Sequence, residues 1–307
     1  LLPSLNVYNP TKLTPQPPST AMVLVPYLAK VVTSFAVGTI ISLAFIEARA
    51  PNDVTISAVG KYDGAAISAY YRQRPLTVLG RLTRIGVPLG LWWLTTQRDQ
   101  FLEKITILNE GSATALRSAR GSQLRQLLVN TGSVTFIKSG QALAIRPDIV
   151  KVPEYVKELE KLQDAVGTFE DSVAFAIIEE DLGRPIGQIY DFPYGTSPIA
   201  SASIGQVYKG VVKKTGQEVA IKVQRPDALG SAALDMFVLR TAAGIFKRIK
   251  KLNSDLVSIA DEFGGQLFGE LDYQQEARNC IRFKELYGGG RIPGIVVPGV
   301  DLELTSN

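Results

Sequence analysis

The sequence predicts an α+β fold in which a long helical region precedes a small antiparallel sheet. From Asp99 to about Asp181, apolar residues recur three and four positions apart, which is the spacing of amphipathic helices. Residues 203–212 and 218–224 instead have the pattern of two strands, and the short turn between them predicts a hairpin. Helical spacing resumes over 227–252 and 255–287, and the apolar run Ile295–Val297 predicts a last strand.

Composition excludes several kinds of chemistry. The chain has 307 residues, a length typical of two domains of about 150 residues each. It contains one cysteine and no histidine, so an intrachain disulfide, a Cys- or His-based metal site and a histidine general base are all excluded. The formal net charge of +4 is too small to indicate a nucleic-acid partner, and we expect none.

Two segments near the amino terminus suit a membrane. Residues 1–20 are rich in proline and lack acidic residues, which predicts an irregular leader that has been processed. Residues 21–46 are apolar except for Lys30 and small polar residues, and three interpretations stay open: a membrane-embedded helix, a buried soluble helix and a targeting remnant. Residues 72–94 combine arginines with leucines and tryptophans, typical either of an interfacial helix or of a helix packed on the next domain.

One lysine stands out in the second strand of the hairpin. The two-residue period puts Val219, Ile221 and Val223 on one face and Lys222 on the other. A buried ammonium needs a counter-charge or a ligand phosphate, and the alternative is an edge-strand lysine facing water. The string Val-Ala-Ile-Lys that ends at Lys222 also matches the protein-kinase strand whose lysine pairs with nucleotide phosphates and with a glutamate on the next long helix.

The segment before the hairpin occupies the place of a kinase Gly-rich loop. Here the sequence is Ala200-Ser201-Ala202-Ser203, so the loop should be stiffer than a glycine loop. Its backbone N–H groups and the hydroxyls of Ser201 and Ser203 remain candidates for contact with phosphate oxygens.

Two further clusters carry charge. Lys138 and Gln141 share a helix face at i and i+3, a pair that is ordinarily solvated. Downstream, Asp272 and Glu276 follow Glu270 and share a face of the predicted helix at i and i+4. Like charges so placed repel, which favours a facing cation, either Lys138 or Lys222.

Together these stretches resemble the UbiB-type atypical kinases, also called aarF-domain-containing or ADCK-like kinases, of bacteria, mitochondria and plastids. Lys138-Ser139-Gly140-Gln141 matches the Lys-x-Gly-Gln signature of that family, Ala200–Ser203 its Ala-rich loop, Lys222 its nucleotide lysine, and Glu270-Leu271-Asp272 its Glu-x-Asp signature. The resemblance covers about residues 74–307, with further matches at Arg146-Pro147-Asp148 and Leu162-Gln163-Asp164. Ser201 departs from an all-alanine loop.

The resemblance implies a protein-kinase-like small lobe, an antiparallel sheet plus a long helix, preceded by an α-helical extension that folds over the cleft. Lys222 would hold the phosphates of ATP or ADP, with Glu276 as its ion-pair partner and Glu270 as the runner-up. Lys138 and Gln141 would lie near Glu270 and Asp272 and act as a gate that blocks access of a protein substrate.

These observations divide the chain into four parts. We expect a leader at 1–20, an apolar segment suited to membrane association and a linker at 21–71, the helical extension at 72–190, and the small lobe at 191–307. No catalytic Asp, metal-binding Asn or Asp-Phe-Gly-like ligand of a large lobe can be located. We therefore expect this chain alone to be inactive and to hold no metal, Mg²⁺ entering only with a large lobe.

The resemblance further implies a membrane-associated kinase or ATPase linked to prenylquinone or other isoprenoid-lipid metabolism. Its partners would be a nucleotide, a membrane lipid or prenyl lipid, and a membrane protein complex. The expected location is a plastid thylakoid or cyanobacterial-type membrane, with the mitochondrial inner membrane second. The alternative of a different class is a non-catalytic scaffold or auxiliary subunit of a membrane complex that keeps a kinase-like lobe.

Overall fold

The computed structural model describes residues 20–50, 61–105, 109–163, 167–250, 253, 255–288, 292 and 294–306. Nearly all of the predicted leader, the stretch 51–60 and Asp164 of the Leu-Gln-Asp match lie outside the described residues. The chain forms two compact units, Leu1–Arg49 and Ala50–Asn307.

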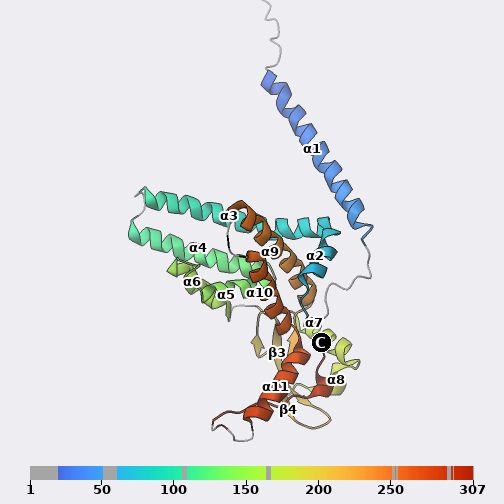
Figure 1. The fold of residues 1–307 in the computed structure, drawn as a ribbon. Coiled ribbons are helices and arrows are strands. Elements are labelled where there is room, and N and C mark those ends of the chain that lie inside the picture. The colour runs from blue at the N-terminus through green and yellow to red at the C-terminus, as the bar shows by residue number, and fades with distance from the viewer. Residues whose placement is uncertain are drawn as a thin grey trace, which may run out of the picture. The chain divides into compact units, whose positions relative to one another are not determined.

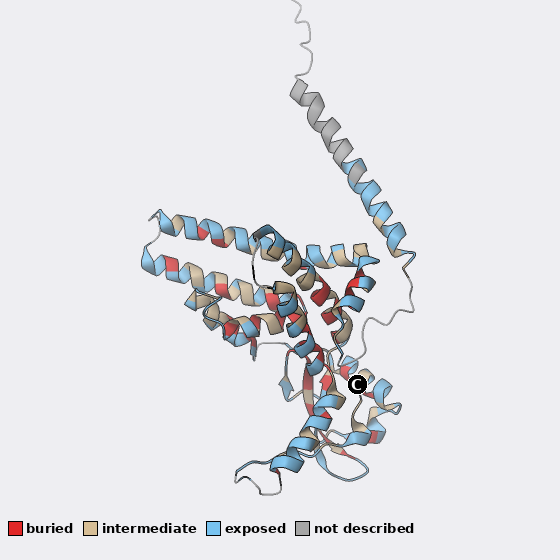
Figure 2. Cartoon of the chain, in the orientation of Figure 1, coloured by how far each residue is buried: buried red, intermediate tan, exposed pale blue. Residues whose placement is uncertain are grey.

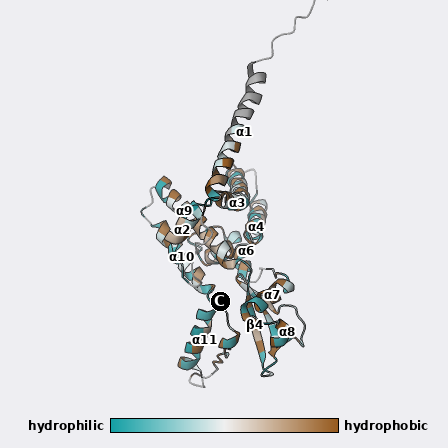
Figure 3. Cartoon of the chain, turned by 90° about the vertical axis from the view of Figure 1, so that its right-hand side faces the viewer, coloured by the Kyte–Doolittle hydropathy of each residue, from teal (hydrophilic) through white to brown (hydrophobic). Residues whose placement is uncertain are grey.

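The first unit contains one long helix, α1 (Thr20–Glu47). Its described residues include large apolar side chains that are exposed. They are Val37, Ile40, Ile41, Phe45 and Ile46. Figure 3 colours parts of this helix as hydrophobic. The helix expected at 21–46 is therefore present, while its relation to a membrane stays a prediction.

The second unit begins with helices (Figure 1). The apolar spacing predicts those between 99 and 181, whereas the helix Gly64–Arg72 lies in the stretch 21–71 and was not predicted. Local sequence explains where several of these helices start. Asp63, Asn109 and Ser133 are side-chain N-caps, and Pro75 and Pro153 occupy first helical positions, where a missing N–H has no cost. The elements are α2 (Gly64–Arg72), α3 (Pro75–Lys104), α4 (Glu110–Asn130), α5 (Val134–Ala144), α6 (Pro153–Glu160), the 3-10 turn η1 (Lys161–Gln163), α7 (Asp171–Leu182) and α8 (Ile186–Ile189).

A four-stranded antiparallel sheet follows, with β3 (Gly205–Val212) at its centre. β4 (Glu218–Gln224) pairs along β3 and places Val207 opposite Lys222, which confirms the predicted hairpin. Two short strands, β1 (Tyr190–Asp191) and β2 (Ala200–Ser201), pair with β3 as well. These two-residue strands were not predicted, because segments so short carry no alternation.

The alternation expected for β4 is confirmed. Ile221 and Val223 are buried, whereas Lys222 on the opposite face is exposed. β3 begins two residues after the predicted start at Ser203, because Ala202, Ser203 and Ile204 form the turn from β2.

The carboxy-terminal helices differ from prediction at one point. α9 (Ala228–Lys250) agrees with the spacing, but the continuous helix predicted over 255–287 is wrong. It is divided into α10 (Leu256–Glu270) and α11 (Tyr273–Tyr287). The break occurs because Asp272 adopts extended backbone and caps α11, accepting a hydrogen bond from the backbone N–H of Gln275 at 2.7 Å.

The strand predicted at Ile295–Val297 is also wrong. This segment has no regular structure, and Val296 is 92% exposed. A three-residue apolar run forms a strand only where a neighbouring strand accepts its hydrogen bonds. The described end of the chain contains instead a single 3-10 turn, η2 (Leu302–Leu304).

Buried residues from distant parts of the sequence share one core (Figure 2). Ile67 and Tyr71 of α2 and Val134 of α5 pack with residues of α9 and α10, including Phe268. A second core lies between α7, α8 and the sheet, and a third joins α3, α4, α5 and α6. The proposed boundary at 190/191 stays a prediction, but the helices before and after it are packed together.

The described residues contain one helix, Ala228–Ile249 within α9, that is long and apolar enough to cross a membrane by length and composition. Ala233 and Met236 of this helix are completely buried in the first core. The first half of α9 therefore belongs to this core, whereas Ile245, Phe246 and Ile249 near its end are exposed.

Candidate functional site

Lys222 of β4 and Glu276 of α11 form an ion pair. The Lys222 Nζ lies 2.8 and 2.6 Å from the two carboxylate oxygens of Glu276. The ammonium also lies 4.4 Å from the centre of the Tyr273 ring. The ion-pair partner expected for Lys222 is thus confirmed as Glu276, and Glu270 is not involved.

A second ion pair lies at the other side of the α10–α11 junction. Nζ of Lys138 on α5 is 2.5 Å from a carboxylate oxygen of Glu270, the last residue of α10. Leu271 between the helices is completely buried, and its carbonyl accepts a hydrogen bond from Gln224 Nε2 at 2.8 Å. The junction is therefore tied both to α5 and to the end of β4, and it orients the first turn of α11 that carries Glu276.

Asp272 has a different role from the one expected. Asp272 does not lie within a helix as predicted, because it precedes α11 as its N-cap. Its second oxygen lies 3.7 Å from the guanidinium of Arg278. Each acidic residue of the cluster thus has its own cation: Lys138 for Glu270, Arg278 for Asp272 and Lys222 for Glu276.

Gln141 does not lie against the acidic cluster as expected. Its Nε2 donates to the carbonyl oxygen of Leu162 at 2.9 Å and so ties α5 to η1. The neighbouring Gly140 is required by packing, since a Cβ there would lie 2.5 Å from Leu162 Cδ1 and 2.8 Å from Leu128 Cδ1. Lys138 and Gln141 were predicted to form the gate together. In this structure Lys138 contacts the acidic cluster, whereas Gln141 binds the Leu162 carbonyl instead.

The Ala200–Ser203 loop is closed by a residue that sequence reasoning missed. The guanidinium of Arg225, which directly follows β4, donates to the carbonyls of Gly167 and Ala202 and to Ser201 Oγ. Ser201 Oγ itself donates to the Gly167 carbonyl at 3.1 Å, and Ser203 is buried. Both hydroxyls that were expected to meet phosphate oxygens are therefore turned toward the protein.

Arg225 is an unusual cation because its described acceptors are carbonyl and hydroxyl groups. Burial lowers the pKa of its guanidinium from the ordinary value, although the group remains protonated. Arg225 lies directly after a strand and before Pro226, and no sequence pattern there marks it as a functional residue.

A cavity of about 480 Å³ lies beside the Lys222–Glu276 pair. It is bounded by β4, by the inner face of α11 and by the segment 298–306. Tyr273 lines this cavity. Burial, and to a smaller extent the nearby Glu276 carboxylate, raises the pKa of the Tyr273 hydroxyl, which stays protonated. The loop Ala200–Ser203 is not part of the cavity lining, so the structure does not bring the two predicted nucleotide contacts into one cavity.

The described residues contain no group of three or more His, Cys, Asp or Glu side chains arranged to hold a metal ion. What the arrangement offers is a cavity with one ammonium at its wall, held by a carboxylate and an aromatic face. Such an ammonium suits an anionic ligand, because a phosphate group can compete with the carboxylate for it.

Comparison with known families finds that residues 161–307 match the ABC1 atypical kinase-like domain. A protein of Synechocystis sp., designated uncharacterized protein sll0005, is 43% identical over 251 residues, covering 80% of this chain and 34% of that protein. The chloroplastic aarF domain-containing protein kinase At1g71810 of Arabidopsis thaliana is 37% identical over 250 residues, covering 81% of this chain and 34% of that protein. The chain thus spans about a third of the length of these relatives.

Among solved structures, the complex of Rv3197 with erythromycin from Mycobacterium tuberculosis is 30% identical. The match has a TM-score of 0.38 and covers 52% of this chain and 40% of that one.

Proposed function

Residues 161–307 of this chain belong to the ABC1 atypical kinase-like family, and from this premise we propose that the chain supplies the ATP- or ADP-binding lobe of a membrane-associated atypical kinase or ATPase. The observation that carries the proposal is the ion pair between Lys222 and Glu276 at the wall of a cavity of about 480 Å³. The kinase-like α+β fold and the Lys138–Glu270 pair at the α10–α11 junction support the same interpretation.

Lys222 is the residue of the cavity lining that suits a nucleotide phosphate, whereas the other charged residues that line it, Glu218, Glu276 and Asp301, are acidic. Lys222 and Glu276 are both partly solvent-accessible, with 34% and 56% of their side chains exposed. A partly solvated pair exchanges partners at little cost, whereas a fully buried one would not. Glu276 would hold the ammonium in place, and the ammonium would neutralise one phosphate oxygen. When bound, Mg²⁺ would shield the remaining phosphate charge.

We predict that Lys222→Met weakens ATP or ADP binding about ten- to hundredfold in the full-length protein, because a hydrogen bond to a charged group contributes about 1.5–3 kcal/mol. Methionine keeps the apolar stem and removes the charge. The measurement is the Kd of each nucleotide by calorimetry.

Lys209→Met is the matched control for this variant. Lys209 lies on the neighbouring strand β3, is 38% exposed and also pairs with a glutamate and an aromatic ring. Its replacement should leave the Kd unchanged. Equal affinities of the Lys222→Met and unmodified proteins would contradict the assignment. A lack of nucleotide binding by the unmodified protein would favour the scaffold alternative.

For membrane association, we propose α1 as the anchor. Between Lys30 and Glu47 the sequence contains no charged residue, and at about 1.5 Å per residue this stretch is about 24 Å long. Snorkelling of the terminal charged side chains extends the reach of such a segment toward the hydrocarbon thickness of about 30 Å. The second predicted segment is less suited, because Arg81 and Trp92 of α3 make hydrogen bonds inside the protein.

Removal of residues 1–49 is expected to shift the full-length protein from the membrane fraction to the soluble fraction. This cut follows the boundary between the two compact units and leaves the cores of the second unit intact. The control is Leu91→Gln/Leu94→Gln, which makes polar two exposed positions of α3 and should not change the partition. Retention of the shortened protein in the membrane fraction, with release of the α3 variant, would refute α1 as the anchor.

For the biological setting, we propose a plastid or cyanobacterial-type membrane, with the thylakoid as first choice, and a role in prenylquinone or other isoprenoid-lipid metabolism. The origin of the relatives in Synechocystis and in chloroplasts supports the compartment. The lipid role rests on the family resemblance. Comparing the prenylquinone content of cells with and without the gene tests it.

A further inference from the structure

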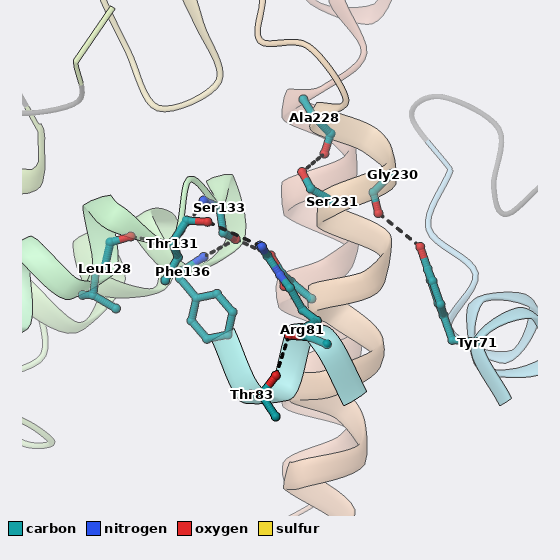
Figure 4. A network of polar contacts seen from close by, with 12 residues as sticks. Tyr71, Arg81, Thr83, Leu128, Thr131, Ser133, Phe136, Ala228, Gly230 and Ser231 are labelled. Atoms are coloured by element: carbon teal, nitrogen blue, oxygen red, sulfur yellow. Dashed lines mark hydrogen bonds and ion pairs between the residues drawn. The ribbon is translucent and has the colours of Figure 1, made fainter. Parts of the chain in front are cut away.

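A buried carboxylate joins three helices on the side of α5 where that helix begins. Asp235 of α9 is completely buried, and the guanidinium of Arg81 on α3 binds both of its oxygens, at 2.7 and 2.8 Å. Ser133 donates a further hydrogen bond to the same carboxylate. Figure 4 shows the side chains of Arg81 and Ser133 converging on this point.

Ser133 links that carboxylate to the start of α5. It is the N-cap of the helix, and its Oγ accepts a hydrogen bond from the backbone N–H of Phe136 at 3.2 Å. The turn that leads into it is fixed as well, since Thr131 Oγ1 donates to the Leu128 carbonyl at 2.6 Å and accepts from the backbone N–H of Ser133 at 3.1 Å. One hydroxyl therefore both caps α5 and joins the helix to Asp235.

Lys138 and Glu270 lie on two helices that both pack on α9, the helix that carries Asp235. Lys138 lies on α5, whose first turn is held by Ser133. Glu270 ends α10, which packs on α9 through Phe268 and Leu267 in the first core. Both helices that carry the pair thus pack on α9, and α5 is in addition joined to it by the hydrogen bond from Ser133 to Asp235.

From this arrangement we propose that Asp235 and Ser133 are positioning residues that set the angle of α5 and thereby hold Lys138 against Glu270 at the α10–α11 junction. A buried ion pair is often no more stabilising than apolar residues of the same volume, so stability alone does not explain a charge here. A carboxylate with a bidentate partner and a third hydrogen bond has one favoured orientation, which apolar packing would not impose. The consequence for nucleotide binding rests on the proposed function, whereas the positioning of Lys138 does not.

The test measures how fast Lys138 reacts with an acylating reagent, without nucleotide, by mass spectrometry of the full-length protein. Lys214, which is 83% exposed, serves as the internal reference. In the unmodified protein Lys138 is shielded, with 24% of its side chain exposed. Ser133→Ala should raise its reactivity about two- to fivefold, the range expected when a partly exposed ion pair is lost. Ser133→Thr, which keeps the hydroxyl, should restore the original rate.

Two further variants separate positioning from general destabilisation. Glu270→Gln breaks the pair directly, and the double variant Ser133→Ala/Glu270→Gln should react no faster than Glu270→Gln alone. Asp99→Asn breaks a matched pair with Arg120, at 2.6 Å and with 9% and 15% exposure, about 27 Å further along α3. It should lower the melting temperature without changing the Lys138 rate.

The proposal is overturned if Ser133→Ala leaves the Lys138 rate unchanged, or if Asp99→Asn raises it equally. These outcomes are distinct from failure of the proposed function, which would appear as unchanged nucleotide affinity in Lys222→Met. If Lys222→Met weakens binding while Ser133→Ala does not, the positioning of Lys138 has no effect on the cavity, and that part of the proposal is wrong.

Discussion

Replacing Arg81 with Met is expected to lower the free energy of unfolding by about 3–5 kcal/mol, because it leaves the carboxylate of Asp235 buried without its counter-charge. Asp235 is 0% exposed and the Arg81 side chain 11% exposed, so water reaches the carboxylate poorly. The remaining hydrogen bond from Ser133 does not neutralise the charge. The melting temperature should therefore fall by roughly 6–20 °C for a unit of this size.

Thermal unfolding monitored by circular dichroism checks this result. Arg98→Ala is the control, since Arg98 pairs with Asp99 while 62% of its own side chain is exposed, and its loss should cost about 1 kcal/mol or less. The double variant Arg81→Met/Asp235→Leu removes both charges and should recover part of the lost stability. A melting temperature of Arg81→Met equal to that of Arg98→Ala would show that the buried pair is energetically unimportant.

The second large effect is expected for Leu271→Ala, at the junction between α10 and α11. Leu271 is completely buried in the first core, and truncation of such a side chain costs about 2–5 kcal/mol. The void left by the truncated Leu271 side chain would lie directly between Glu270 and the first turn of α11. We therefore expect weaker nucleotide binding in addition to the lower melting temperature, because both ion pairs depend on the geometry of this junction.

Leu159→Ala distinguishes the two effects. Leu159 of α6 is 1% exposed and lies in the third core, so its truncation should destabilise the protein to a similar extent. Nucleotide affinity, measured well below both melting temperatures, should fall in Leu271→Ala and remain unchanged in Leu159→Ala. Equal affinities in the two variants would mean that the junction does not orient the site.

Two ion pairs of the candidate site could be predicted from sequence, because they follow from motifs at fixed spacing. The pairing of Lys222 with Glu276 follows from the resemblance to a kinase strand and the helix after it, and the structure contains it. The contact between Lys138 and the Glu-x-Asp segment was predicted on the same basis and is present with Glu270. This pair is partly exposed, with 24% of the Lys138 side chain and 44% of the Glu270 side chain accessible to solvent.

The break at the α10–α11 junction was within reach of sequence analysis but was missed. Asp272 and Gln275 have the spacing of a capping box, a motif that marks the start of a helix. The apolar spacing on both sides of Asp272 concealed this motif, because helical periodicity alone does not report whether one helix or two is present. The interpretation of Asp272 as a residue within one continuous helix followed from that error.

The sequence by itself determined the elements and their order: helices before the sheet, the β3–β4 hairpin, and the face of β4 that carries Lys222. These depend on periodicity and turn chemistry, which act over a few residues. Only the tertiary structure decided that Arg81 points to Asp235, that Arg225 closes the Ala200–Ser203 loop, and that Gln141 binds the Leu162 carbonyl. Each of these contacts joins residues more than twenty positions apart, and no local pattern encodes which distant acceptor a polar side chain meets once the cores have packed.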